Sequence, residues 1–144
     1  MTVAAILKHK GREIASVPPT MAIADVVRSL SARRIGAVLV LGGSNQLLGI
    51  LSERDLVHAL AAHGAAMLQM SASDLMTRTV QTATPATTEV EALELMTKGR
   101  FRHLPVMDDG HLAGVISIGD VVKARIMQQE CEVDSLKAYV GGVA

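Results

Sequence analysis

One segment occurs twice in this chain, and this internal repeat constrains the fold more than any other feature of the sequence. Residues 49–57 (GILSERDLV) and 114–122 (GVISIGDVV) share Gly, Ser and Asp at equal spacing, with apolar residues matched between them. Further upstream, Pro19 corresponds to Pro85 and Val38 to Leu104. A repeat with one apolar face cannot bury that face alone, so we expect the two copies to pack together with pseudo-two-fold symmetry, leaving paired clefts at their interface.

The same order of elements, β-α-β-β-α, is predicted for both copies. A short strand runs into a proline turn, an amphipathic helix follows, two β-type runs form a hairpin, and Asp55 or Asp120 introduces a second helix. In the first copy these elements are residues 13–17, 21–34, 37–41, 47–52 and 56–62. In the second they are residues 79–83, 87–100, 103–107, 112–117 and 121–128. The predicted fold class is therefore α/β (α+β), built from two such repeats.

The repeat also sets the expected domain boundaries. We expect repeat 1 at residues 5–63, a linker at 64–76, repeat 2 at 77–127 and a C-terminal tail at 128–144. Within the linker, Ser-Asp before Leu-Met predicts a helical turn capped by Ser73. An apolar stripe near and within the tail is expected to pack on a second subunit and form a homodimer; its residues are Ile126, Met127, Val133, Leu136, Tyr139 and Val140.

Composition excludes several classes of function. Phe101 and Tyr139 are the two aromatic residues, and the 14 basic residues balance the 14 acidic ones, which disfavours binding to nucleic acids or to an anionic membrane surface. The single cysteine, Cys131, cannot form an internal disulfide. No run of about 18 apolar residues and no secretory signal pattern is present, so we expect a soluble, cytoplasmic protein.

Catalysis and metal binding are not expected. His58 and His63 are five residues apart, which does not match the i, i+4 spacing of helical zinc ligands, and no glutamate completes an HExxH motif. His103 and His111 flank a predicted hairpin without acidic or cysteine neighbours that would complete a metal site. No Gly-rich phosphate loop, nucleophile–base pair or pair of opposed carboxylates is found, so the chain is predicted not to be an enzyme.

The motifs AVLVL…LLGILSERD and LPVM…G…LAGVISIGD resemble the cystathionine-β-synthase, or CBS, domain, and the resemblance covers roughly residues 5–127. It implies a regulatory module, of the kind usually attached to enzymes, channels or transporters, and a pair of CBS domains that binds AMP, ADP, ATP, NAD or an S-adenosylmethionine derivative. No attached domain of that kind is found in this sequence, so we expect the pair either to act in trans on an unidentified regulated protein or merely to bind its ligand.

Two Ser-x-x-Asp motifs, one per copy, are the leading candidates for ligand contacts. Ser52 and Asp55, like Ser117 and Asp120, lie where a strand is predicted to end and a helix to begin. Amides at a helix start can meet a phosphate, and an Asp carboxylate can accept hydrogen bonds from both ribose hydroxyls. The alternative is that these residues simply cap their helices.

The resemblance also implies where the rest of a nucleotide would lie. It implies an adenine pocket beside the second strand of each copy, at Ile35, Gly36, Ala37, Phe101, Arg102 and His103, and a polar contact from Thr77. Backbone contacts to the base are expected from the first strands, at Ala15, Ser16, Gln81 and Thr82. We expect phosphate contacts from Arg54, Arg102 and His103, whereas Arg33, Arg34 and Arg100 are interpreted as solvated residues at helix ends. A homodimerisation module with vestigial clefts remains the alternative function.

Overall fold

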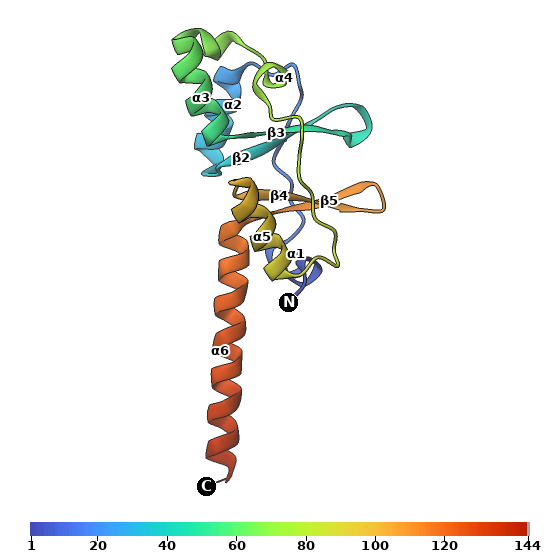
Figure 1. Ribbon diagram of the computed structural model, residues 1–144, viewed down its shortest axis with the longest axis vertical. Helices are drawn as coiled ribbons and strands as arrows, with labels where there is room; N and C mark the ends of the chain where they lie inside the picture. The colour runs from blue at the N-terminus through green and yellow to red at the C-terminus, as the bar shows by residue number, and fades with distance from the viewer. Residues whose placement is uncertain (144) are drawn as a thin grey trace. The chain divides into compact units, whose positions relative to one another are not determined.

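The computed structural model describes residues 1–143 and divides the chain into two compact units (Figure 1). Among the described residues, unit 1 comprises 1–12, 82–109 and 113–143, and unit 2 comprises 13–81 and 110–112. Each unit contains the α-β-β-α part of one repeat. The segment that precedes each repeat in the sequence belongs to the unit of the other repeat.

Unit 2 is built on a three-stranded sheet with the order β1-β2-β3. β1 (Ser16–Val17) pairs in parallel with β2 (Ala37–Leu41), and β2 pairs antiparallel with β3 (Leu47–Ser52). α2 (Ile23–Arg33) and α3 (Glu53–His63) complete the repeat; a 3-10 turn, η1 (Gly43–Asn45), joins β2 to β3, and η2 (Gly64–Gln69) with α4 (Ala72–Leu75) follows α3. The core residues Ile23, Val26 and Leu30 recur at helical spacing on α2, as the sequence pattern predicts.

Unit 1 contains α1 (Val3–Lys10), α5 (Glu89–Gly99), β4 (His103–Asp108), all but the first two residues of β5 (His111–Ser117), which pairs with β4, and α6 (Ile118–Val143). Asp109 and Gly110 join the hairpin, both at positive φ as a two-residue primed turn requires. The core lies between α1, α5, the hairpin and the first turns of α6, with Ile6, Leu7, Met96, Leu104 and Ile116 almost fully buried. Figure 1 shows α6 continuing beyond this core as one helix, which ends at Val143.

The segment before each repeat makes equivalent hydrogen bonds in both units. In unit 1 the amide of Val3 donates to the Thr87 carbonyl (2.8 Å), and in unit 2 the amide of Ala72 donates to the Met21 carbonyl (2.8 Å). The domain boundaries expected from the sequence were drawn from the similarity between the two copies of the repeat. Each compact unit combines one repeat with a segment from outside that repeat.

The glycine shared by the two copies explains how these segments fit. A Cβ atom on Gly49 would lie 2.7 Å from the Thr77 carbonyl oxygen and 2.7 Å from the Met76 sulfur, and one on Gly114 would lie 2.8 Å from Leu7 Cδ2. All three distances are shorter than a Cβ atom tolerates. The repeated Gly is therefore needed because a segment from outside the repeat packs directly on the strand at this position.

Several sequence predictions of the elements were wrong in detail. The strand predicted at residues 79–83 is reduced to one bridge, Ala83 to Val106. In the first copy Leu39 donates its amide to the Ala15 carbonyl, whereas its counterpart Pro105 has no N–H to donate, so the ladder does not extend. The strand predicted at residues 13–17 is likewise shortened to Ser16–Val17.

The helix starts also differ from those predicted. Ser52, not Asp55, is the N-cap of α3, and Ser71, not Ser73, caps α4. The second-copy helix predicted at residues 121–128 begins at Ile118 and continues through the tail, and α1 was not predicted at all. In each Ser-x-x-Asp motif, therefore, the serine begins the helix and the aspartate completes a capping box.

Replacing the two glycines tests the close approach of these segments. Gly49→Ala should lower the free energy of unfolding by about 2 kcal/mol, because its methyl group meets a backbone oxygen that cannot rotate away. Gly114→Ala should cost less, since the Leu7 side chain can change rotamer. The control is Gly43→Ala, where nothing lies within 4 Å. Urea unfolding measures all three, and equal stability of Gly49→Ala and Gly43→Ala would contradict the packing.

Candidate functional site

In unit 2, a closed set of hydrogen bonds forms where β3 ends and α3 begins; we call it junction 1. The Ser52 amide and hydroxyl donate to Asp55 Oδ2 at 2.9 and 3.1 Å, and the Asp55 amide donates to Ser52 Oγ at 3.4 Å. The hydroxyl of Thr77 donates to the other carboxylate oxygen, Oδ1, at 3.0 Å. Both oxygens of Asp55 therefore have protein donors.

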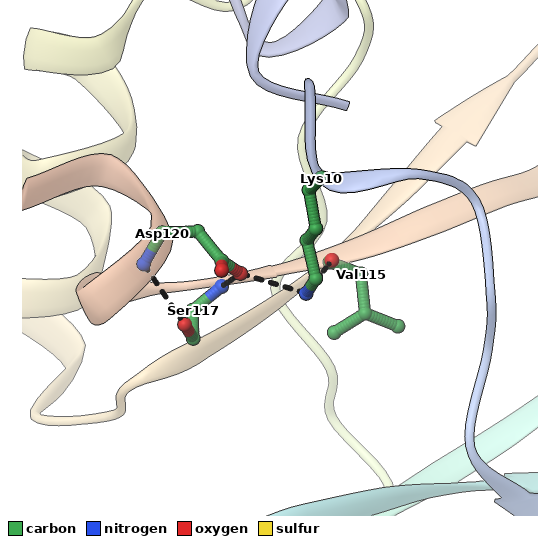
Figure 2. Close-up of polar contacts among 4 residues, drawn as sticks. All are labelled: Lys10, Val115, Ser117 and Asp120. Atoms are coloured by element: carbon green, nitrogen blue, oxygen red, sulfur yellow. Dashed lines mark hydrogen bonds and ion pairs between the residues drawn. The ribbon is translucent and has the colours of Figure 1, made fainter. Parts of the chain in front are cut away.

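The equivalent set in unit 1, junction 2, lies between β5 and α6 (Figure 2). The Ser117 amide donates to Asp120 Oδ2 at 2.8 Å, and the Asp120 amide donates to Ser117 Oγ at 3.1 Å. Lys10 replaces the threonine of junction 1: its Nζ lies 2.7 Å from Asp120 Oδ2 and donates to the Val115 carbonyl at 2.6 Å. The two junctions thus share the hydrogen bonds between serine and aspartate. They differ in the third residue, which is the neutral Thr77 at junction 1 and the cationic Lys10 at junction 2.

Lys10 and Ser117 together determine the ionisation of Asp120. Partial burial raises the pKa of this carboxyl, but the hydrogen bond and positive charge of Lys10, with the hydrogen bonds from Ser117, outweigh burial and lower its pKa below the ordinary value of 3.8. Asp120 is therefore a carboxylate at neutral pH. In this form it can accept hydrogen bonds but cannot donate one.

The residues expected to form the adenine pockets lie beside the junctions of their own repeats. The Glu53 amide donates to the Gly36 carbonyl at 3.0 Å, and the Ile118 amide donates to the Arg102 carbonyl at 2.8 Å. Ala37 pairs directly with Ser52 across the β2–β3 ladder. The structure therefore brings the segments 35–37 and 101–103 next to Ser52 and Ser117, respectively.

The first-strand residues are placed less uniformly. The Ala15 carbonyl accepts from the Leu39 amide at 3.0 Å, and Ser16 pairs with Leu39 on β1, so both lie on the sheet of junction 1. Gln81 and Thr82 lie outside any strand, on an exposed stretch just before the Ala83 bridge. Their backbone is not held in a ladder as that of Ala15 and Ser16 is.

Two backbone amides at the start of each helix donate to protein groups. The amides of Glu53 and Asp55 donate to Gly36 and Ser52, and those of Ile118 and Asp120 donate to Arg102 and Ser117. These four amides are thus not available to a phosphate without rearrangement.

Sequence reasoning missed Lys10 and gave Thr77 only through the family resemblance. Lys10 ends α1, 110 positions before Asp120 in the sequence (10 to 120), and no local pattern links the two residues. The only sequence signal for this helix is the helical spacing of the apolar residues Val3, Ile6 and Leu7. All three are buried on one side of α1.

Among residues 1–143, His, Cys, Asp and Glu side chains nowhere gather in the groups of three that could hold a metal ion. Cys131 is exposed on α6. None of the described helices combines the length and apolar character needed to cross a membrane.

The Lys10–Asp120 pair should make stability depend on pH. Because the folded pKa of Asp120 is lowered, its contribution to stability is present above about pH 4 and is lost as the pH falls through the lowered value. Lys10→Met should reduce the free energy of unfolding by about 1–2 kcal/mol at pH 7, and its difference from the wild type should shrink in acid. Lys8→Met, an exposed position on the same helix, is the control. Urea unfolding at pH 7 and pH 2.5 measures the effect, and a difference that does not change with pH would contradict it.

Comparisons with known proteins agree on one family. The chain matches the family model of the CBS domain at residues 6–62 and 72–126. It is 36% identical over 122 residues to the mitochondrial CBS domain-containing protein CBSX3 of Arabidopsis thaliana. The aligned region covers 82% of this chain and 59% of CBSX3. The chain therefore spans less than two thirds of the length of that relative.

Solved structures lead to the same result. A CBS-domain containing protein from Agrobacterium tumefaciens is 48% identical and superimposes with a TM-score of 0.84, covering 86% of this chain and 92% of that one. A CBS domain protein from Pyrobaculum aerophilum, complexed with AMP, is 27% identical and superimposes with a TM-score of 0.73. The match covers 83% of this chain and 89% of the Pyrobaculum chain. With two matched repeats that cover most of its length, the chain belongs to the CBS domain family.

Proposed function

We propose that this CBS pair is a regulatory module that binds an adenine nucleotide of the AMP, ADP, ATP or NAD type, with Asp55 or Asp120 holding the ribose. The observation that carries the proposal is the repeated junction, where a partly buried aspartate is held by the serine three residues before it. The AMP complex of the Pyrobaculum aerophilum protein supports the choice of ligand.

A carboxylate suits a ribose because it accepts from two neighbouring hydroxyl groups. At junction 2, the hydrogen bonds from Ser117 and Lys10 both fall on Asp120 Oδ2. At junction 1, both oxygens of Asp55 accept hydrogen bonds, from Ser52 and Thr77. Because each carboxylate oxygen has more than one lone pair, either aspartate can accept a further donor.

The cations near the junctions favour an anionic ligand. Lys10 contacts Asp120 directly, and Arg54 lies in the first turn of α3 beside Asp55. A phosphate near Lys10 would share the ammonium group with Asp120, whereas Thr77, which takes the place of Lys10 at junction 1, is neutral and leaves Arg54 as the nearby cation. We therefore expect the two junctions to respond differently to the charge of the phosphate.

A second function is favoured by a specific observation. The capping hydrogen bonds of both junctions are complete without a ligand, which is what a purely structural role in helix capping would require. In that case the chain would be a homodimerisation module with no ligand. In either case we propose no catalysis by its own residues.

A ligand titration separates the two functions. In a thermal-shift series with AMP, ADP, ATP, NADH and S-adenosylmethionine, a ligand at about 100 times its dissociation constant should add about 2.7 kcal/mol and raise Tm by several degrees. Asp55→Asn or Asp120→Asn should weaken binding at least tenfold, because an amide replaces one acceptor oxygen with a donor.

The chain contains its own control for these variants. Asp74 completes a third capping box with Ser71, at α4, where the Ser71 amide donates to Asp74 Oδ2 at 2.9 Å. Asp74→Asn should affect capping in the same way but leave nucleotide affinity unchanged. If none of the five ligands raises Tm, or if Asp74→Asn weakens binding as much as the junction variants do, the nucleotide proposal is wrong.

A further inference from the structure

The second half of α6 has no partner in the described part of the chain. Every residue from 129 to 141 is exposed, although the same helix is buried at Val121 and Ala124 where it meets the core of unit 1. The match to the CBS family model ends at residue 126, so this segment lies outside the matched region. A helix that stays regular after leaving its core needs another surface to cover its apolar residues.

The apolar residues of α6 follow a heptad pattern over residues 122–140. Ile126, Val133 and Val140 recur every seven residues and take the a positions, while Val122, Gln129 and Leu136 take the d positions. The five apolar members have exposed fractions from 47% for Val122 to 67% for Val140. Val121 and Ala124 fall at c and f, on the opposite side of the helix, so the a/d seam faces away from the core of unit 1.

The charges beside this seam identify its partner. In a parallel, in-register pair of helices, each g residue lies opposite the e residue five positions further along the other chain. Here Glu132 (g) lies opposite Lys137 (e), and Arg125 (g) lies opposite Glu130 (e), so both contacts join opposite charges. Arg125 also lies 3.4 Å from Glu89 in its own chain, which makes Glu132–Lys137 the cleaner contact.

An antiparallel pair with the same overlap would be repelled. Positions e then face e, and g face g, which places Lys123 opposite Lys137, Glu130 opposite Glu130 and Glu132 opposite Glu132. β-Branched residues take all three a positions, as two-stranded coiled coils favour, and Leu136 takes one of the d positions beside Val122 and Gln129. The sequence of α6 is therefore complementary to a parallel second copy of itself.

We infer that residues 122–140 of α6 form a parallel, in-register two-stranded coiled coil with a second copy of this chain. The seam is about 27 Å long at 1.5 Å per residue. It would place the two chains side by side with their α6 helices running in the same direction. This inference is independent of nucleotide binding and would hold if the proposed ligand were wrong.

Neighbouring residues inside and outside the seam provide a matched test. Leu136→Lys, at d, should raise the dissociation constant of the dimer at least tenfold in sedimentation equilibrium, because it brings two lysines together in the seam. Ser135→Lys, at c, adds the same charge outside the seam and should leave the dimer unchanged. Both positions are exposed, and circular dichroism checks that both variants fold. Equal association of the two variants would overturn the inference.

The orientation is tested by charge reversal and cross-linking. Glu132→Lys should weaken the dimer, and adding Lys137→Glu in the same chain should restore it, since these residues meet only between chains. With Cys131→Ser as background, Leu136→Cys should form a disulfide-linked dimer under mild oxidation and Ser135→Cys should not. A dimer that forms without this selective cross-link, or a double reversal that fails to restore association, would show that α6 does not pair in parallel.

Discussion

The hydrogen bonds between a serine and the aspartate three residues later fix the end of a strand to the start of a helix in both repeats. At junction 1 the Ser52–Asp55 box orients α3, and the adjacent Glu53 amide ties the helix to Gly36 on the neighbouring segment. Ser117 and Asp120 do the same at the start of α6. Since the residues implied as a nucleotide site are also those that hold the helices, ligand binding at either junction would be coupled directly to helix position. That coupling is what a regulatory module needs.

Much of the fold follows from local sequence patterns, and the differences arise where distant segments meet. The hairpins, α2 and α5 were predicted within a few residues because alternation and helical spacing are local signals. Both Ser-x-x-Asp motifs were also found, although the serine proved to be the cap. The shortening of the strand predicted at residues 79–83 depends on Pro105, which has no N–H. This matters because Leu39, at the equivalent position of the first copy, donates its amide to the first strand.

The candidate site was predictable only in part, for the same reason. The repeated Ser-x-x-Asp motif is visible in the sequence. The two junctions are distinguished by Thr77 and Lys10, which come from segments outside the repeats that they contact. The glycines at 49 and 114 were recognised as shared positions, but their role appears only once Met76, Thr77 and Leu7 are seen to pack on them. Contacts between residues this far apart in the chain leave no periodic signal.

The central claim is that the Ser-x-x-Asp junctions bind a nucleotide rather than only cap helices, and an NMR titration tests it most directly. Adding AMP while following the backbone amides should shift the resonance of Ser52 or Ser117, because each donates to the aspartate expected to hold the ribose. The Ser71 amide, in the capping box of α4, should not move. Saturable shifts at Ser52 or Ser117 alone would match the proposal, whereas no shift at either residue at millimolar AMP, or equal shifts at Ser71, would contradict it.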